Sequence, residues 1–167
     1  MSDALKSVAS GRSKLSSHAT ATRTAYAKLA VGSPEECGCE PCRNFAAQRN
    51  TIYSPPARAL FEALGIRSDR EAEIYHMSRV ESGRHLYGGW FHFVGFIVSG
   101  ADAAKLVSEN VWRPDLESES ENFGLGFTAR VHLVREPFKG SPLVQLEFDA
   151  HVPWILEAKE PQQSGAK

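Results

Sequence analysis

The chain has 167 residues, of which 42 % are hydrophobic, and its formal net charge at pH 7 is −1. This length suits one compact domain with its own core, and the hydrophobic share is too high for a disordered chain. The nearly neutral charge excludes a global field that would recruit nucleic acid or an anionic membrane. No apolar stretch approaches the roughly 20 residues that a membrane-spanning helix needs. We therefore expect a single domain that has neither a nucleic-acid partner nor a membrane partner.

Composition divides the chain into two tails and one domain. Residues 1–23 are rich in Ser, Ala and Thr, which predicts a flexible N-terminal tail, with an organellar transit peptide as the alternative. Residues 157–167 are polar and predict a flexible C-terminal tail, so the folded domain should cover residues 24–156. No signal-peptide core follows the first residue, and the cysteine count is odd. Both observations favour a cytoplasmic location.

The first half of the domain predicts mainly helices. Residues 26–31 form a weak strand pattern, for which a helical turn is the alternative. A helix is expected over residues 41–49, because its proline suits the first helical turn. A second helix is expected over residues 56–64 and should end at Gly65, since glycine is the preferred residue after the last helical turn. Its apolar stripe, which includes Phe61, should pack on a sheet.

The second half predicts antiparallel strands. Residues 72–80 and 85–98 read as a hairpin that turns at 81–84. Both faces of the second strand are apolar, so it should be central, with helices on one face and another cover on the other. A few helical turns leave too much apolar surface exposed, which predicts a homodimer. Residues 102–108 are expected to form a helical turn.

The last hairpin is predicted from strict alternation. Apolar residues occupy the odd positions of 123–134 and the even positions of 143–152. Paired residues of antiparallel strands lie on the same face of the sheet, so odd positions must pair with even ones. Two registers meet this condition, and they set Arg130 opposite either Glu147 or Asp149.

Together these patterns predict a single α+β domain, with an antiparallel sheet of about five or six strands packed against one or two helices. The acidic run at 115–121 is expected to be a solvated loop. The glycines in Gly88–Gly95 indicate a bulge or a close backbone approach, and they fit a ligand that lies over the sheet. One core should bury a set of residues from three strands: Phe91 or Phe93, Phe127, Leu146 and Phe148.

The three cysteines of the chain all fall between positions 37 and 42. A disulfide within so short a loop would stabilise the fold little, so the thiols should be reduced. Cys39 and Cys42 have the two-residue gap of a zinc knuckle, and Cys37 could supply a third sulfur. The sequence therefore predicts a Zn²⁺-like site in a small binding or structural domain.

Such a site needs one more ligand to close a tetrahedron. The histidines of the central hairpin are the candidates: His92 first, then His85 and His76. Arg43 and Asn44 follow the last cysteine directly, where they could satisfy loop carbonyls or bind an anion at a helix start, and the structural role is favoured.

Two other functions stay open on the residues alone. The Cys39–Cys42 segment resembles the thioredoxin active-site motif, in which a helix N-terminus lowers the thiol pKa, so a thiol-dependent enzyme or redox protein is one alternative. Thioredoxin-like folds need parallel strands with crossover helices, which the antiparallel pattern here disfavours. The other alternative is a metal-free interaction domain in which the cysteines only pack. The sequence does not decide whether the protein is an enzyme.

Three segments together resemble a family of small bacterial proteins that has no established activity. They are CGCEPCRNF at residues 37–45, HLYGGWFHFVG at residues 85–95 and VPW at residues 152–154. The resemblance covers about residues 24–156. It implies a bacterial, cytoplasmic, stand-alone domain and supplies no catalytic residues.

Overall fold

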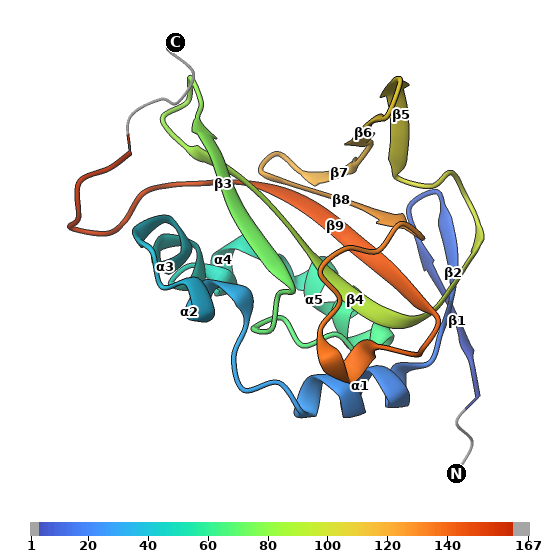
Figure 1. The fold of residues 1–167 in the computed structure, drawn as a ribbon. Coiled ribbons are helices and arrows are strands. Elements are labelled where there is room, and N and C mark those ends of the chain that lie inside the picture. Colours follow the sequence, from blue (N-terminus) through green and yellow to red (C-terminus); the bar gives the residue numbers. More distant parts are fainter. Residues whose placement is uncertain (1–3, 162–167) are drawn as a thin grey trace.

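The computed structural model describes residues 4–161. Within this part of the chain, a seven-stranded antiparallel sheet packs against five α-helices, and a separate two-stranded sheet stands beside it (Figure 1). The predicted α+β class is confirmed, with more strands and helices than expected. No helix in the described range is long and apolar enough to cross a membrane. The elements are β1 (Lys6–Ser10), β2 (Ser13–Ser17), α1 (Ala19–Ala27), α2 (Ser33–Cys37), α3 (Glu40–Ala46), α4 (Arg49–Ile52), α5 (Pro55–Leu64), β3 (Glu73–Arg79), β4 (His85–Ser99), β5 (Ala104–Ser108), β6 (Val111–Pro114), β7 (Glu117–Ser120), β8 (Phe123–Thr128), the 3₁₀-helix η1 (Glu136–Phe138) and β9 (Leu143–Val152).

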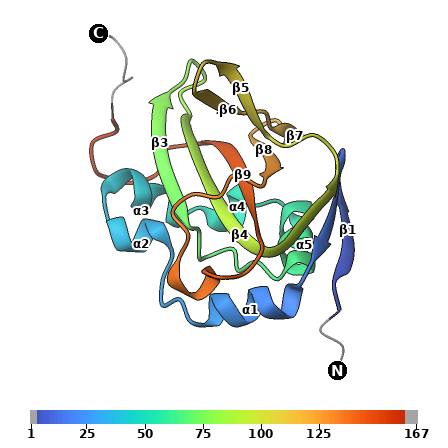
Figure 2. The same cartoon turned by 45° about the vertical axis from the view of Figure 1, so that its right-hand side comes forward.

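Strand β4 is the centre of the sheet, as its two apolar faces predict. The strand order is β1-β2-β4-β9-β8-β7, and β3 pairs with the first half of β4. The expected β3–β4 hairpin is confirmed, and Gly83 in its turn has a φ of +85°. Helix α5 lies on one side of the sheet and the β5–β6 hairpin lies on the other, while α1 lies along the edge of β4, where Thr22 and Tyr26 bond to the strand backbone (Figure 2). This arrangement leaves two different environments on the two faces of β4.

The N-terminal segment differs from the predicted tail. Residues 6–17 form the β1–β2 hairpin, and β2 pairs with the end of β4, with Leu15 opposite Ile97. Leu15 is fully buried, so pairing with a distant strand orders a Ser-rich segment that its composition alone would leave flexible. The weak strand at 26–31 is instead the end of α1 and the turn after it. Of the two predicted tails, at residues 1–23 and 157–167, only residues 1–3 and 162–167 lie outside the described part of the chain.

The predicted helices are present, but the first is divided. Helix α5 matches the expected 56–64 helix, and Gly65 ends it in the left-handed conformation with a φ of +80°. The helix expected over 41–49 is split into α3 and α4, because the chain turns at Gln48. The Gln48 side chain donates to the carbonyl oxygens of Asn44 and Pro153 at 3.1 and 2.8 Å, which fixes that turn.

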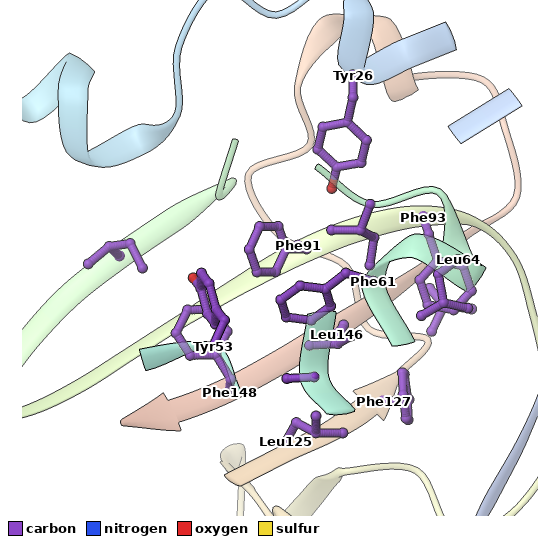
Figure 3. Packing of buried hydrophobic residues seen from close by; sticks show 14 of the residues in the cluster. Tyr26, Tyr53, Phe61, Leu64, Phe91, Phe93, Leu125, Phe127, Leu146 and Phe148 are labelled. Atoms are coloured by element: carbon purple, nitrogen blue, oxygen red, sulfur yellow. The ribbon is translucent and has the colours of Figure 1, made fainter. Parts of the chain in front are cut away.

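The hydrophobic core lies between α5 and the sheet (Figure 3). Phe61 and Leu64 of α5 are buried, as their stripe predicts. The ring centroids of Phe61 and Phe91 lie 5.0 Å apart, and Tyr53 adds a ring 5.2 Å from Phe61. The predicted core set is confirmed as part of one cluster: Phe91, Phe93, Phe127, Leu146 and Phe148.

The register of the last hairpin is neither of the two predicted. Strand β8 ends at Thr128, and Gly126 is the residue opposite Glu147. The predicted faces survive, because an even-numbered slip keeps each side chain on its own face. Arg130 lies outside the strand, where its guanidinium stacks 3.8 Å from the ring centre of Trp112. The connection is long because it inserts Phe138 of η1 into the core.

Two surface segments also differ from expectation. Residues 102–108 contain β5, which pairs with β6, rather than a helical turn. Asp102 accepts hydrogen bonds from the backbone N–H groups of Ala104 and Ala129, at 2.8 and 2.9 Å. These bonds direct the chain into the strand. The acidic run at 115–121 is an edge strand, β7, over part of its length. Because the chain itself covers part of the second face of β4, the homodimer stays a prediction.

Candidate metal centre

The three cysteines lie on a tight turn between two short helices. Helix α2 ends at Cys37, and Gly38 follows with a φ of +67°, a conformation that favours glycine. The N–H of Gly38 donates to the carbonyl of Pro34 at 2.9 Å. Cys39 then has extended backbone and directly precedes α3. The chain therefore reverses direction between the first and second cysteine.

This turn brings the three thiols together, as predicted. The sulfur atoms of Cys37, Cys39 and Cys42 all lie within 4.8 Å of one another. Cys39 and Cys42 are three residues apart at the start of α3, a spacing that puts side chains on the same side of a helix. Four sulfurs at about 2.3 Å from a Zn²⁺ ion are about 3.8 Å from one another, so small side-chain rotations would complete this geometry.

The thiols differ in exposure and in acidity. Cys37 and Cys39 are exposed, whereas Cys42 is buried. The pKa of Cys37 is lowered, mainly because the backbone N–H of Cys39 donates to its sulfur and further because the thiols of Cys39 and Cys42 do so. Burial raises the pKa of Cys42, and the two neighbouring thiols raise it further. A bound cation would favour the thiolate form at all three positions.

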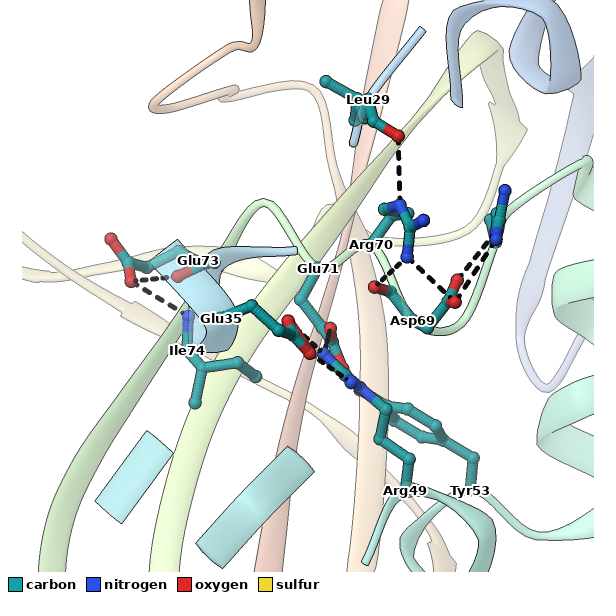
Figure 4. A network of polar contacts seen from close by, with 11 residues as sticks. Leu29, Glu35, Arg49, Tyr53, Asp69, Arg70, Glu71, Glu73 and Ile74 are labelled. Atoms are coloured by element: carbon teal, nitrogen blue, oxygen red, sulfur yellow. Dashed lines mark hydrogen bonds and ion pairs between the residues drawn. The ribbon is translucent and has the colours of Figure 1, made fainter. Parts of the chain in front are cut away.

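A buried ion pair holds α2 and α4 to the start of β3 (Figure 4). Arg49 donates to both carboxylate oxygens of Glu71, at 2.9 and 2.7 Å, and to Glu35 of α2 at 3.0 Å. The hydroxyl of Tyr53 donates to Glu71 at 2.8 Å. Burial raises the pKa of Glu71, and the hydrogen bonds from Arg49 oppose that rise. The backbone N–H of Ser33 also donates to the Glu71 carbonyl at 2.9 Å, so the cysteine turn is attached to a rigid network.

Asn44 has the structural role that the sequence favours. Its side chain is fully buried. Its amide nitrogen donates to the carbonyl of Pro153 at 3.1 Å, and its oxygen accepts from the N–H of Ile155 at 2.9 Å. These bonds fix the chain after β9 against α3. Arg43 is exposed.

The candidate histidines have other partners. Within residues 4–161, no His, Asp or Glu extends the three-cysteine group. Nε2 of His92 lies 3.0 Å from Oε1 of Gln145. His85 bridges His76 and Glu160, with ring nitrogens 2.8 and 2.7 Å from these partners. The structure therefore unites the three sulfurs but brings none of the three histidines to them.

Sequence reasoning missed the Arg49–Glu71 network. Glu71 belongs to a stretch of mixed charge at 68–71, which is the usual composition of a solvated loop. Its carboxylate is nevertheless completely buried. Only the three-dimensional arrangement reveals its partner, which lies 22 positions away in the chain.

The chain matches no protein-family model, and no curated protein or solved structure is significantly similar to it. The family resemblance drawn from the three sequence segments therefore stays a prediction. The geometry of the cysteine turn is the evidence for function.

Proposed function

We propose that this protein is a small metal-binding domain in which Cys37, Cys39 and Cys42 hold a thiophilic ion, with Zn²⁺ as the first candidate. The observation that carries the proposal is the approach of the three sulfur atoms to within 4.8 Å. Three thiols are a donor set that soft and borderline metal ions prefer. Arg49 supports the proposal further, because it is held by the buried Glu71 and also donates to Glu35 of α2, the helix that ends at Cys37.

The fourth ligand would come from outside this cysteine group. Two of the three thiols are exposed, so a water molecule or a donor from another molecule can reach the ion. A zinc site with three protein ligands and one open position can exchange ligands, whereas a closed site is structural only. The domain would then have a reactive or regulated metal rather than a purely structural one.

Metal content tests this function directly. The protein would be purified without a histidine tag and under reducing conditions, and its metal measured by mass spectrometry. We expect one equivalent of zinc in the native protein and a loss of binding in Cys42→Ser. Cobalt substitution should give an intense thiolate-to-cobalt absorption band that weakens in Cys37→Ser. His92→Gln and His85→Asn are the matched controls, and both should retain the metal.

The opposite results would reject the proposal. A metal-free native protein that also fails to bind added Zn²⁺ or Co²⁺ at micromolar concentration would contradict it. Loss of metal from His92→Gln with intact secondary structure would instead show that the site needs this histidine as a ligand. Because metal binding contributes to folding free energy, a chelator should also lower the unfolding temperature.

The contrast between exposed and buried thiols favours one second candidate, a thiol redox or nucleophilic site. Cys37 and Cys39 are exposed while Cys42 is buried. Either exposed thiolate could attack a substrate disulfide and release its first thiol, and Cys42 could then displace the second thiol from the mixed disulfide, so that the substrate is reduced and the cysteine pair oxidised. Rapid alkylation of the exposed thiols in the purified, reduced protein supports this candidate. Protection from alkylation that is lost on adding a chelator supports the metal site, because zinc-bound thiolates are shielded from the reagent.

A further inference from the structure

A second candidate site lies on the face of the sheet that points away from the core. Core residues alternate with outward residues along each strand, and the outward set includes Tyr75, Trp90 and Glu147. These residues and Trp112 of the β5–β6 hairpin line a pocket of about 280 Å³. The pocket therefore lies between the sheet and the hairpin that covers it.

A glycine of β4 allows one of the aromatic residues that line this pocket to lie close to the sheet. Gly88 of β4 is opposite Tyr75 of β3. A Cβ atom at position 88 would lie 2.3 Å from the Tyr75 ring, so only glycine lets that ring lie over the strand. Trp90 is opposite Glu147 of β9, and its indole N–H donates to the carbonyl of His132 at 3.1 Å. Gly88 therefore contributes to the pocket by letting the ring of Tyr75 lie over β4.

The pocket carries opposite charges at its two sides. Glu147 provides a carboxylate on the sheet, and Gln145 donates to one of its oxygens at 2.8 Å. No other hydrogen bond or ion pair to this carboxylate exists among residues 4–161, and burial raises its pKa. Arg113 and Arg130 line the other side. The guanidinium of Arg130 already stacks on Trp112.

We propose that this pocket binds a small zwitterion with an apolar body, such as a free amino acid with an aromatic or aliphatic side chain. Its ammonium group would meet Glu147 and the faces of Tyr75 and Trp90, which attract cations. Its carboxylate would meet Arg130, which can form two parallel hydrogen bonds to such a group. Its apolar part would lie against Trp112.

Both charge and size select this class. A ligand that is only cationic would face Arg113 and Arg130, which have no ion-pair partner among residues 4–161, and one that is only anionic would face Glu147. The pocket volume is slightly below the roughly 300 Å³ at which most small-molecule sites begin, so a single amino acid fits better than a cofactor or an oligomer. The site lies on the opposite face of β4 from the core, and it is independent of the proposed metal.

Tryptophan fluorescence is a built-in reporter of this site. The chain has three tryptophans, and two of them line the pocket, while Trp154 packs against His85. In a Trp154→Phe variant, we expect L-phenylalanine to change the emission with saturation. Phenethylamine, which lacks the carboxylate, and 3-phenylpropionate, which lacks the ammonium group, should each bind at least about tenfold more weakly.

Charge variants give a second test with a matched control. Glu147→Gln keeps the shape of the side chain but removes its charge, so it should weaken L-phenylalanine at least about tenfold and strengthen 3-phenylpropionate, whose carboxylate no longer meets a like charge. Arg130→Gln should also weaken L-phenylalanine at least about tenfold, and it should strengthen phenethylamine. Glu81→Gln in the exposed β3–β4 turn is the control and should bind like the parent protein. Equal affinity for all three compounds would overturn the proposal, as would no saturation by L-phenylalanine at millimolar concentration.

Discussion

Replacing Arg49 by methionine would leave the Glu71 carboxylate inside the protein without its cation. The side chain of Glu71 is 0 % exposed and that of Arg49 is 15 % exposed, so water cannot take the place of the lost partner. Breaking a buried ion pair by removing one member costs about 3–5 kcal/mol. Typical domains have only about 5–15 kcal/mol of total stability, so Arg49→Met should be close to unfolding.

Urea unfolding followed by far-UV circular dichroism measures this loss as a shift in midpoint at constant slope. Glu35→Gln is the comparison, because Glu35 is 34 % exposed and its pair should contribute less than about 1 kcal/mol. The double variant Arg49→Met with Glu71→Leu should recover much of the loss, since an apolar pair needs no compensating charge. A loss below about 1 kcal/mol in Arg49→Met, or a double variant no better than the single one, would refute this reasoning.

The same variant should have a characteristic pH dependence. Burial already raises the pKa of Glu71, and removal of Arg49 should raise it further. A carboxyl group whose pKa is higher in the folded state contributes stability fully below its unfolded value, about 4.3, and loses that contribution as the pH rises through the folded pKa. The stability gap between native protein and Arg49→Met should therefore widen from pH 5 to pH 8.

Three further changes test other parts of the structure. Gly38→Ala should lower the free energy of unfolding by about 1–2 kcal/mol and weaken metal binding. Gly140→Ala is the control: this glycine is also at positive φ and has open space around it, so its loss of stability should be similar and metal affinity should not change. Calorimetry measures the stability of both variants, and cobalt titration measures their metal affinity. In the reduced, metal-free protein, iodoacetamide should modify Cys37 at lower pH than Cys42, because the pKa of Cys37 is lowered and that of Cys42 is raised. Peptide mass spectrometry gives the order of modification, and modification of both thiols at the same pH would contradict the prediction. Leu146→Ala should cost about 2–5 kcal/mol in urea unfolding, since Leu146 is completely buried.

Local periodicity explains how much of the fold could be predicted. Strand β9 alternates between apolar and polar residues, so the face of Phe148 follows from the sequence, whereas both faces of β4 are apolar and predict only that this strand is central. The stop of α5 at Gly65 likewise follows from the freedom of glycine at positive φ. The β1–β2 hairpin could not be predicted, because a Ser-rich pair of short strands becomes stable only by pairing with the distant end of β4. The register of the last hairpin failed for a related reason: the sequence does not show that Phe138 leaves the turn to enter the core.

Only part of the candidate metal centre could likewise be predicted from the sequence. The three cysteines lie within six residues, and the chain reversal at Gly38 brings their side chains together. Their convergence therefore depends on local sequence alone. A fourth ligand is a long-range property, because it depends on how strands pack against the turn. The imidazole of His92 could bind a metal ion, but its Nε2 atom is hydrogen-bonded to Gln145 of β9. The sequence therefore predicts the three cysteine ligands, but it cannot predict which residues lie next to them in the fold.

Strand β4 connects the two candidate sites and also keeps them apart. Its Tyr87 lies on the core side, where the hydroxyl donates to the carbonyl of Pro41 at 2.8 Å, directly beside the cysteine turn. Its Trp90 lies on the other side, in the aromatic pocket. The strand between them pairs with a neighbour on each side, and these two ladders hold it in one register. Coupling needs an element with two alternative arrangements, so metal and zwitterion should bind independently.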